Sequence, residues 1–271
     1  MIKKLLRNIF GSEKSNKTVN PIDEYMSNGR IPWSEGYQEY KFKTLFQHLR
    51  DDDLSRSFDS LKLPNDYGHG LDERIVEIPW AVNKLSSGNA KLLDAGSSLN
   101  FKAIVTLEKI ENKDVTIYTF DPERKNFNNK RVSYVYSDLR DLPFKDNLYD
   151  EIACISTIEH IDMDNSIYGW NENNAHVDNQ NKSYEYLKVV EELVRVLKSD
   201  GKLLLTFPYG KFENHGFFQQ FDREMLDRVL ELFDKQGTYG LTFFRYLDGG
   251  WNFCEQEDCA DIISFNPHTG R

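Results

Sequence analysis

The chain has 271 residues, of which 39% are hydrophobic and 29% are charged, and its formal net charge is −10. This composition is typical of a globular protein with a buried core, and it excludes the disordered and fibrous classes. The acidic balance argues against nucleic acid as the main partner, because a polyanion is bound by a concentrated basic face. Three cysteines without CxxC spacing indicate neither a disulfide framework nor a zinc ribbon, so we expect a cytoplasmic protein.

Residues 1–20 form a basic amphipathic start followed by a polar linker. Lys3, Lys4 and Arg7 alternate with apolar side chains, whereas residues 11–20 show no apolar period. The start suits either weak peripheral contact with an anionic membrane surface or an ordinary frayed terminus. No apolar run approaches the roughly 20 residues of a membrane span, and no signal-peptide cleavage pattern follows.

Residues 21–85 are rich in aromatic and charged side chains and predict an N-terminal helical cap, with a helix over residues 37–49. Glycines stand beside aromatic and charged residues in the phrases IPWSEGYQEYK and GHGLDERIVEIPW. Tyr37, His69 and Arg74 are therefore candidates to fold over an acceptor site. Core packing and surface ion pairs are the alternative roles for these side chains.

From residue 86 to residue 271, apolar strands alternate with helical patterns. This alternation predicts βαβ units and a mostly parallel sheet, and therefore an α/β fold. The apolar strand segments are KLLDAG, VTIYTFD, VSYVYSD, YDEIACIST and KLLLTFP, and helices are expected over residues 101–111, 183–197 and 223–233.

The loop from Asp94 to Asn100 follows the first of these strands and precedes a helix. Ligands of doubly wound sheets bind at the carboxyl ends of the strands, where a glycine lets the backbone approach the ligand. The helix that follows favours an anionic group at its N-terminus. Because the loop has the single glycine Gly96, an ordinary strand-to-helix turn remains the alternative.

Acidic residues also follow the next two strands. Asp121 ends the second strand, where a carboxylate accepts hydrogen bonds from the two hydroxyls of a ribose. Asp138 and Leu139 end the third, where they suit an adenine amino group and the adenine ring. Helix capping or a turn is the alternative for each aspartate, but with Asp94 three successive strands end in Asp.

The fourth strand runs into Ser156, Glu159 and His160. With LRDLPFKDNLYD upstream and LVRVLKSDGKLLLTFP downstream, this segment resembles the class I, Rossmann-like S-adenosylmethionine-dependent methyltransferases, in particular their small-molecule branch. The resemblance covers about residues 90–210. It implies a doubly wound, mostly parallel seven-stranded sheet with helices on both faces.

The resemblance also implies that S-adenosyl-L-methionine is the cofactor. Ser97, Ser98 and Leu99 depart from the family pattern, in which a second glycine is common, and a Cβ there narrows the space for the ligand. The Ser97 hydroxyl compensates if it bonds the methionine carboxylate. The cofactor residues implied are Asp94, Gly96 and Ser97 for the methionine part, Asp121 for the ribose, Asp138 and Leu139 for the adenine, and Ser156 at the end of the fourth strand.

His160 is the candidate general base, because a hydroxyl acceptor must lose a proton and imidazole has a suitable pKa. Glu159 is its catalytic partner or, alternatively, a cofactor or loop contact. The alternative role for His160 is structural, with its hydrogen bonds fixing the loop.

The long polar segment from residue 161 to residue 182 predicts an acceptor-binding lid. Its acceptor-binding candidates are Asp164, Trp170 and His176, and His215 is a further candidate after the fifth strand. Trp170 suits stacking on a sugar face or anchoring the loop. An Asp/His metal site is a weaker alternative without fixed spacing, so no metal is expected.

The resemblance implies methyl transfer. The acidic and aromatic composition, the absence of a basic face and the long polar segment favour a small polar or carbohydrate acceptor, with O-methylation in surface-glycan or secondary metabolism as the expected reaction. A nucleotide-sugar oxidoreductase or epimerase that binds NAD is one alternative, since Tyr184 and Lys188 have the Tyr-xxx-Lys spacing. A non-catalytic binding module with a methyltransferase-like fold is the other.

Overall fold

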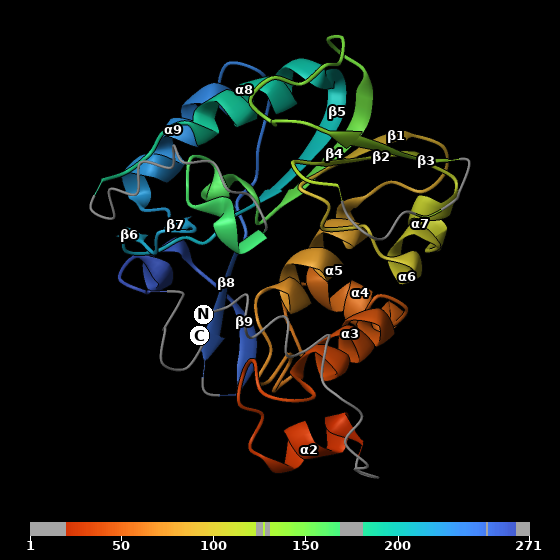
Figure 1. Ribbon diagram of the computed structural model, residues 1–271, viewed down its shortest axis with the longest axis vertical. Helices are drawn as coiled ribbons and strands as arrows, with labels where there is room; N and C mark the ends of the chain where they lie inside the picture. Colours follow the sequence, from red (N-terminus) through yellow and green to blue (C-terminus); the bar gives the residue numbers. More distant parts are fainter. Residues whose placement is uncertain (1–19, 123–126, 128–130, 169–180, 248, 264–271) are drawn as a thin grey trace.

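A parallel β-sheet of five strands crosses the protein in the order β3-β2-β1-β4-β5 (Figure 1). β1 pairs with β2 on one side and with β4 on the other, so the strand order reverses between β1 and β4. Such a reversal leaves a crevice at the carboxyl ends of the two strands, where ligands bind. The strands are β1 (Lys91–Ala95), β2 (Asp114–Thr119), β3 (Val132–Tyr136), β4 (Tyr149–Ile155) and β5 (Leu197–Thr206). The computed structural model describes residues 20–122, 127, 131–168, 181–247 and 249–263.

Successive strand residues enter two apolar clusters on opposite faces of the sheet. Leu92 and Ala153 belong to one cluster, and their neighbours Leu93 and Cys154 belong to the other, as the two-residue period of a strand requires. Helices α3, α4 and α5 cover the first face, and α8 and α9 cover the second (Figure 1). None of the helices that the structure describes has the length and apolar character of a membrane span. The helices are α2 (Pro21–Ser27), α3 (Tyr37–His48), α4 (Asp52–Asp59), α5 (Arg74–Lys84), α8 (Tyr186–Val196) and α9 (Arg223–Phe233).

Helix α5 connects the N-terminal segment to the sheet. Its residues Ile75, Ile78 and Ala81 are at most 3% exposed and belong to the cluster on the first face. Their spacing of three places them on one side of the helix. The boundary expected at residue 85 therefore falls directly after a helix that belongs to the core.

The single helix expected over residues 101–111 is wrong, because two one-turn helices occupy this segment. α6 (Lys102–Val105) ends at Thr106, whose hydroxyl donates to the Lys102 carbonyl at 2.8 Å. Leu107 then adopts an extended backbone with ψ 145°, and α7 (Glu108–Glu111) follows. Threonine hydroxyls compete for helical carbonyls in this way, and apolar periodicity does not report it.

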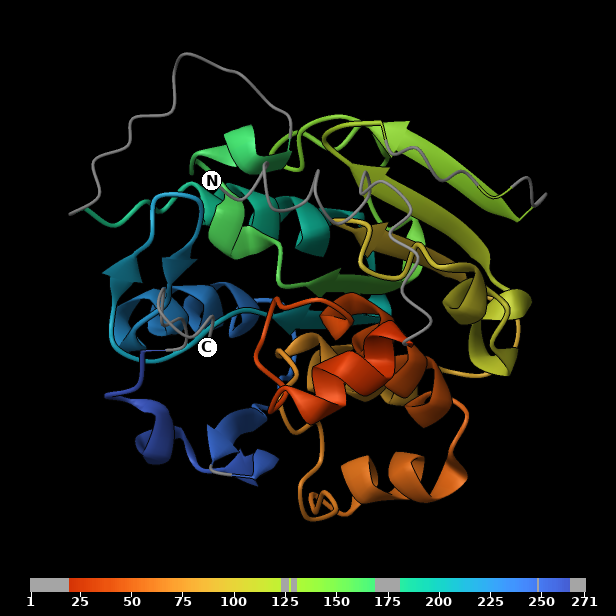
Figure 2. The same ribbon diagram turned by 60° about the horizontal axis from the view of Figure 1, so that its bottom comes forward.

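After β5 the chain forms two separate antiparallel ladders, β6 with β7 and β8 with β9. We expected a sheet of seven strands, but the main sheet has five strands in the described residues. The β8–β9 hairpin packs instead on the N-terminal segment (Figure 2), where the backbone N–H of Trp251 donates to the Tyr67 carbonyl at 2.8 Å. The remaining elements are β6 (Glu213–Asn214), β7 (Gln219–Gln220), β8 (Phe243–Leu247), β9 (Gly250–Cys254) and the 3-10 turns η1 (Ile158–His160), η2 (Asn165–Tyr168) and η3 (Gln256–Cys259).

Candidate active site

The loop after β1 lies at the carboxyl edge of the sheet, and Asp94 shapes it from within. The Asp94 carboxylate is fully buried and accepts the backbone N–H groups of Ser98 and Leu99 at 3.1 and 2.8 Å. Gly96 has a φ of 107°, and a Cβ at this position would overlap the Thr157 side chain. The site therefore requires glycine here, and Asp94 and Gly96 together fix the path of the loop.

Two polar groups beside this loop have no partner within the described residues. The Ser97 hydroxyl is buried without a hydrogen bond, and Ser97 has a left-handed φ of 63°. Asp121 is half-buried after β2, and no hydrogen bond or ion pair to a described residue engages its carboxylate. A buried hydroxyl without a partner is costly unless a ligand satisfies it. Ser97 suits a carboxylate and Asp121 suits a ribose, so these residues fit the expected cofactor.

Asp138, the third strand-end aspartate, is already engaged. Its carboxylate accepts the backbone N–H and the guanidinium N–H groups of Arg140 at 2.6 to 3.1 Å. Burial alone would raise the pKa of Asp138, but the hydrogen bonds from Arg140 outweigh burial and leave that pKa below its usual value. Leu139 is 7% exposed and belongs to the cluster beneath α8 and α9. An adenine amino group therefore has to share the Asp138 carboxylate with Arg140, and the adenine contacts stay predictions.

Side chains of α5 hold the end of β4. Ser156 has a left-handed φ of 39°, and its hydroxyl donates to the two Glu77 carboxylate oxygens at 2.7 and 2.8 Å. Arg74 donates to the carbonyls of Ile155 and Ser156 at 3.0 and 3.1 Å. The Ser156 hydroxyl, expected on the cofactor, is turned to α5 because the buried Glu77 carboxylate needs a donor.

Glu159 and His160 form the turn η1, with Glu159 Oε1 and His160 Nε2 3.9 Å apart. Burial raises the pKa of Glu159 to about 8, although the Arg74 charge opposes this effect. Burial also lowers the pKa of His160 to about 4. The Arg74 charge lowers this pKa further, and the hydrogen bond to Phe217 opposes the shift. At neutral pH Glu159 is therefore protonated and His160 is neutral, so their contact is not an ion pair.

The His160 ring is anchored by the segment between β6 and β7. Its Nδ1 atom lies 2.7 Å from the Phe217 carbonyl oxygen. Because a carbonyl only accepts, the ring proton is assigned to Nδ1 and the lone pair to Nε2. The His215 ring stacks on Phe218 at 4.4 Å, and Phe218 lies 6.1 Å from the His160 ring. The structure thus brings together two histidines that the sequence analysis selected separately.

The segment of the predicted acceptor lid, residues 161–182, begins next to this hairpin. The Asp164 N–H donates to the Gly216 carbonyl at 2.9 Å, which ties the start of the segment to the histidine cluster. Trp170 and His176 lie outside the described residues. Where the structure describes the chain, it holds no group of three or more His, Cys, Asp or Glu side chains arranged for a metal ion.

Tyr184 and Lys188, whose spacing suited a nicotinamide-dependent enzyme, are each bound to a carboxylate. The Tyr184 hydroxyl donates to Glu224 at 2.8 Å, and the Lys188 ammonium donates to Glu185 at 2.8 and 2.9 Å. The Tyr184 contact joins the start of α8 to α9, whereas the Lys188 contact is a local ion pair whose ammonium side chain is 60% exposed.

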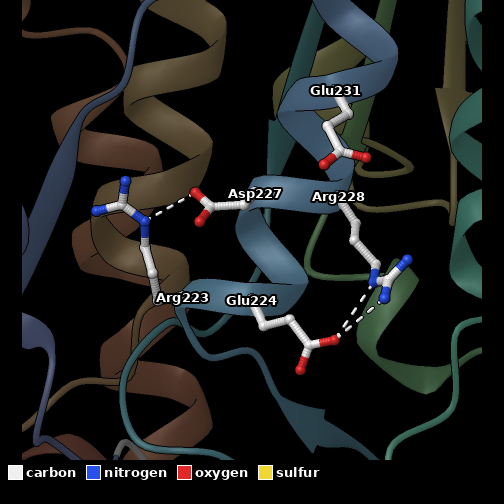
Figure 3. A pocket seen from close by; sticks show the side chains of 5 residues that line it. All are labelled: Arg223, Glu224, Asp227, Arg228 and Glu231. Atoms are coloured by element: carbon white, nitrogen blue, oxygen red, sulfur yellow. Dashed lines mark hydrogen bonds and ion pairs between the residues drawn. The ribbon is translucent and has the colours of Figure 1, made fainter.

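A surface hollow of about 430 Å³ lies along α9 (Figure 3). Two ion pairs within the helix line it, with Arg223 Nε 2.7 Å from Asp227 Oδ1 and Arg228 Nη2 3.3 Å from Glu224 Oε1. Salt-bridged charges one helical turn apart are typical of a solvated helix face. The hollow includes no residue of the strand-end loops, so we do not connect it with the chemistry.

Comparison with known proteins bears on the domain that contains the sheet. A sequence profile of the methyltransferase domain family matches residues 95–205. A search of curated proteins finds no match. Among solved structures, the cyclase SpnF is 15% identical, with 85% of this chain and 67% of that chain covered and a TM-score of 0.43. A Bacillus halodurans protein described as a methyltransferase is 17% identical, with 64% and 73% covered and a TM-score of 0.41.

A sarcosine dimethylglycine methyltransferase described from Galdieria sulphuraria is 21% identical, with 59% of this chain and 57% of that chain covered and a TM-score of 0.36. These distant likenesses carry no argument about activity. The profile match is the informative finding, because the matched residues run from the end of β1 into β5. The chain therefore contains a class I, Rossmann-like methyltransferase domain. The protein is a methyltransferase, and its methyl donor is S-adenosylmethionine.

Two residues of the site escaped the sequence analysis, namely Glu77 and Thr157. Glu77 stands three residues after Arg74 and is within 3.2 Å of it, and this helical spacing was the signal available for it. Thr157 had no such signal, because its contact with Gly96 joins residues of two different strand ends.

Proposed function

We propose that the enzyme transfers the methyl group to a hydroxyl oxygen of a small polar or carbohydrate acceptor. S-adenosylmethionine supplies the methyl group on a sulfonium centre, and the acceptor loses its proton as the new O–C bond forms. The observation that carries the proposal is the 2.7 Å contact between His160 Nδ1 and the Phe217 carbonyl oxygen, which assigns the ring proton to Nδ1. The lone pair of Nε2 is then the acceptor of the hydroxyl proton.

The cofactor contacts follow from the loop geometry. Ser97 would donate to the methionine carboxylate, and Asp121 would accept the ribose hydroxyls. Asp138 and Leu139 would border the adenine, while Asp94 shapes the loop through the backbone of Ser98 and Leu99. Since positioning and exclusion of water supply much of the catalysis of methyl transfer, this rigid loop supports the proposal.

The acceptor is proposed to bind beside the two histidines. Asp164 and His215 lie at the same hairpin as His160, and Trp170 and His176 are proposed as further contacts from the lid. A net charge of −10 and the polar lid favour a sugar or sugar nucleotide over a nucleic acid. We place the reaction in surface-glycan or secondary metabolism in the cytoplasm, with weak membrane contact through residues 1–10 as an additional element of the proposal.

Release of S-adenosylhomocysteine during a screen of hydroxyl acceptors tests this function. His160→Ala is expected to lower kcat about 100-fold or more, because a positioned base contributes on this order, with cofactor affinity preserved. His48→Ala serves as control, since its ring packs on Tyr67 in the N-terminal segment at 4.8 Å.

An unchanged kcat in His160→Ala would remove the proposed base. Cofactor binding without transfer to any hydroxyl acceptor would reject O-methylation.

A further inference from the structure

The end of β4 extends beyond its ladder with β1. The last paired residues of the two strands are Asp94 and Ala153, so Ile155 has no ladder partner on the β1 side. Its carbonyl instead accepts the Ser98 hydroxyl at 2.8 Å, the Thr157 hydroxyl at 3.0 Å and the Arg74 guanidinium at 3.0 Å. Side chains therefore define where β4 ends and where the Glu159–His160 turn begins.

Arg74 is the group that joins these contacts to α5. Its two terminal nitrogens donate to different carbonyls, Nη1 to that of Ile155 and Nη2 to that of Ser156. Nη1 also lies 3.2 Å from Glu77 Oε2. Glu77 in turn accepts the Ser156 hydroxyl. A planar guanidinium spans such a set of acceptors, whereas an ammonium is a point charge.

The same guanidinium faces the ionisable groups of the turn. Arg74 acts electrostatically on Glu159 and on His160, and Glu77 of α5 and Glu73, the residue before α5, act on Glu159. Glu159 is 3% exposed, and its Oε2 atom has no hydrogen bond within the described residues. Arg74 is thus the cation whose charge opposes the effect of burial on the Glu159 carboxyl group beside the candidate base.

We propose that Arg74 and Glu77 are positioning residues for methyl transfer, which hold the end of β4 so that the Glu159–His160 turn keeps its place. Both lie outside the segment that matches the methyltransferase family. The inference rests on the proposed role of His160. It extends the functional unit from the matched domain to α5, so the N-terminal segment contributes to the site and does more than cover it.

The test compares Arg74→Lys with Arg195→Lys. Arg195 is a matched control because it also binds two backbone carbonyls, those of Phe144 and Leu142, and a glutamate three residues away. The two arginine side chains are 25% and 32% exposed. Arg195 holds the segment that precedes β4, at the other end of the strand from His160.

We expect similar decreases in Tm for the two variants but different kinetics. Arg74→Lys should lower kcat about 10- to 100-fold with little change in the KM for the cofactor, because misplacement by about 1 Å costs on this order. Arg195→Lys should keep kcat within about two-fold.

A second pair of variants serves if Arg74→Lys fails to fold. Glu77→Gln keeps the size of the side chain and an acceptor for Ser156, so it should retain more activity than Glu77→Ala. Equal kcat values for Arg74→Lys and Arg195→Lys, or for the two Glu77 variants, would overturn the proposal.

An NMR measurement separates this inference from the proposed function. Long-range proton–nitrogen spectra report the His160 ring directly, and His160→Gln assigns its signals. The proposal predicts that Arg74→Lys shifts the His160 ring signals or its titration, and that Arg195→Lys does not. Unshifted signals in Arg74→Lys would overturn it. A wild-type protein that methylates no hydroxyl acceptor would reject the proposed function alone.

Discussion

At the scale of single residues, the site holds two ionisable groups whose pKa values burial shifts in opposite directions. Burial raises the pKa of Glu159 to about 8 and lowers that of His160 to about 4. Between these values the pair has one protonation state, with the proton on Glu159 and the lone pair on His160 Nε2. This state is the one that a proton acceptor requires.

The kcat–pH profile tests this protonation state. We predict that kcat stays constant through the range near pH 6.5, where an ordinary histidine titrates, and falls only as the pH approaches about 4. The reason is that a lowered pKa preserves the neutral ring in acid. A second change is expected as Glu159 ionises near pH 8.

The profile is measured at saturating cofactor and acceptor, and Glu159→Gln is the control. This variant should lose the alkaline change and keep the acid limb. An inflection near pH 6.5 in the wild-type profile would contradict the buried environment of His160.

At the scale of elements, a buried ion pair lies at the amino ends of the strands, opposite to the carboxyl ends where the candidate active site lies. Lys113 Nζ lies 2.6 Å from Glu151 Oε2, and the two side chains are 0% and 4% exposed. The other Glu151 oxygen accepts the Ser86 N–H at 2.7 Å. Lys113 precedes β2 and Glu151 lies in β4, so the pair braces the sheet from the end opposite to the strand-end loops.

Removal of one partner of this pair should destabilise the protein. Lys113→Met is predicted to lower the free energy of unfolding by about 3–5 kcal/mol, because it leaves a buried carboxylate without a counter-charge. Urea unfolding measures the effect, and Lys113→Met/Glu151→Gln should recover part of it. The exposed pair of Arg131 and Asp114 gives the control, since Arg131→Met should cost about 1 kcal/mol or less. A similarly small loss for Lys113→Met would show that the pair does not brace the sheet.

The sequence predicted the elements best where the evidence was local. The helix over residues 223–233 has the predicted bounds, and Asp94 and Asp121 stand at the ends of their strands. Contacts between distant segments were not predictable in this way. Arg140 donates to the Asp138 carboxylate, and the Ser156 hydroxyl donates to Glu77, which lies 79 residues away in the sequence. Periodicity identifies faces and ends of elements, but it does not say which side chain reaches which partner.

At the scale of the whole molecule, segments outside the matched domain are packed into it. α5 contributes Ile75 and Ala81 to the apolar cluster on one face of the sheet, and the β8–β9 hairpin adds Trp251 beside it. The N-terminal segment and the C-terminal hairpin therefore pack into the same apolar cluster as the sheet in the described part of the chain.

The central claim is that the cofactor binds at the carboxyl ends of β1 and β2, and calorimetric titration with S-adenosylhomocysteine tests it most directly. We predict that one ligand binds per chain. Asp121→Asn should bind it about ten-fold or more weakly than the wild type, because the ribose hydroxyls lose a charged acceptor. Asp114→Asn, at the opposite end of β2, should keep the affinity within about two-fold of wild type. No binding by the wild-type protein at about millimolar ligand, or an equal loss of affinity in both variants, would contradict the account.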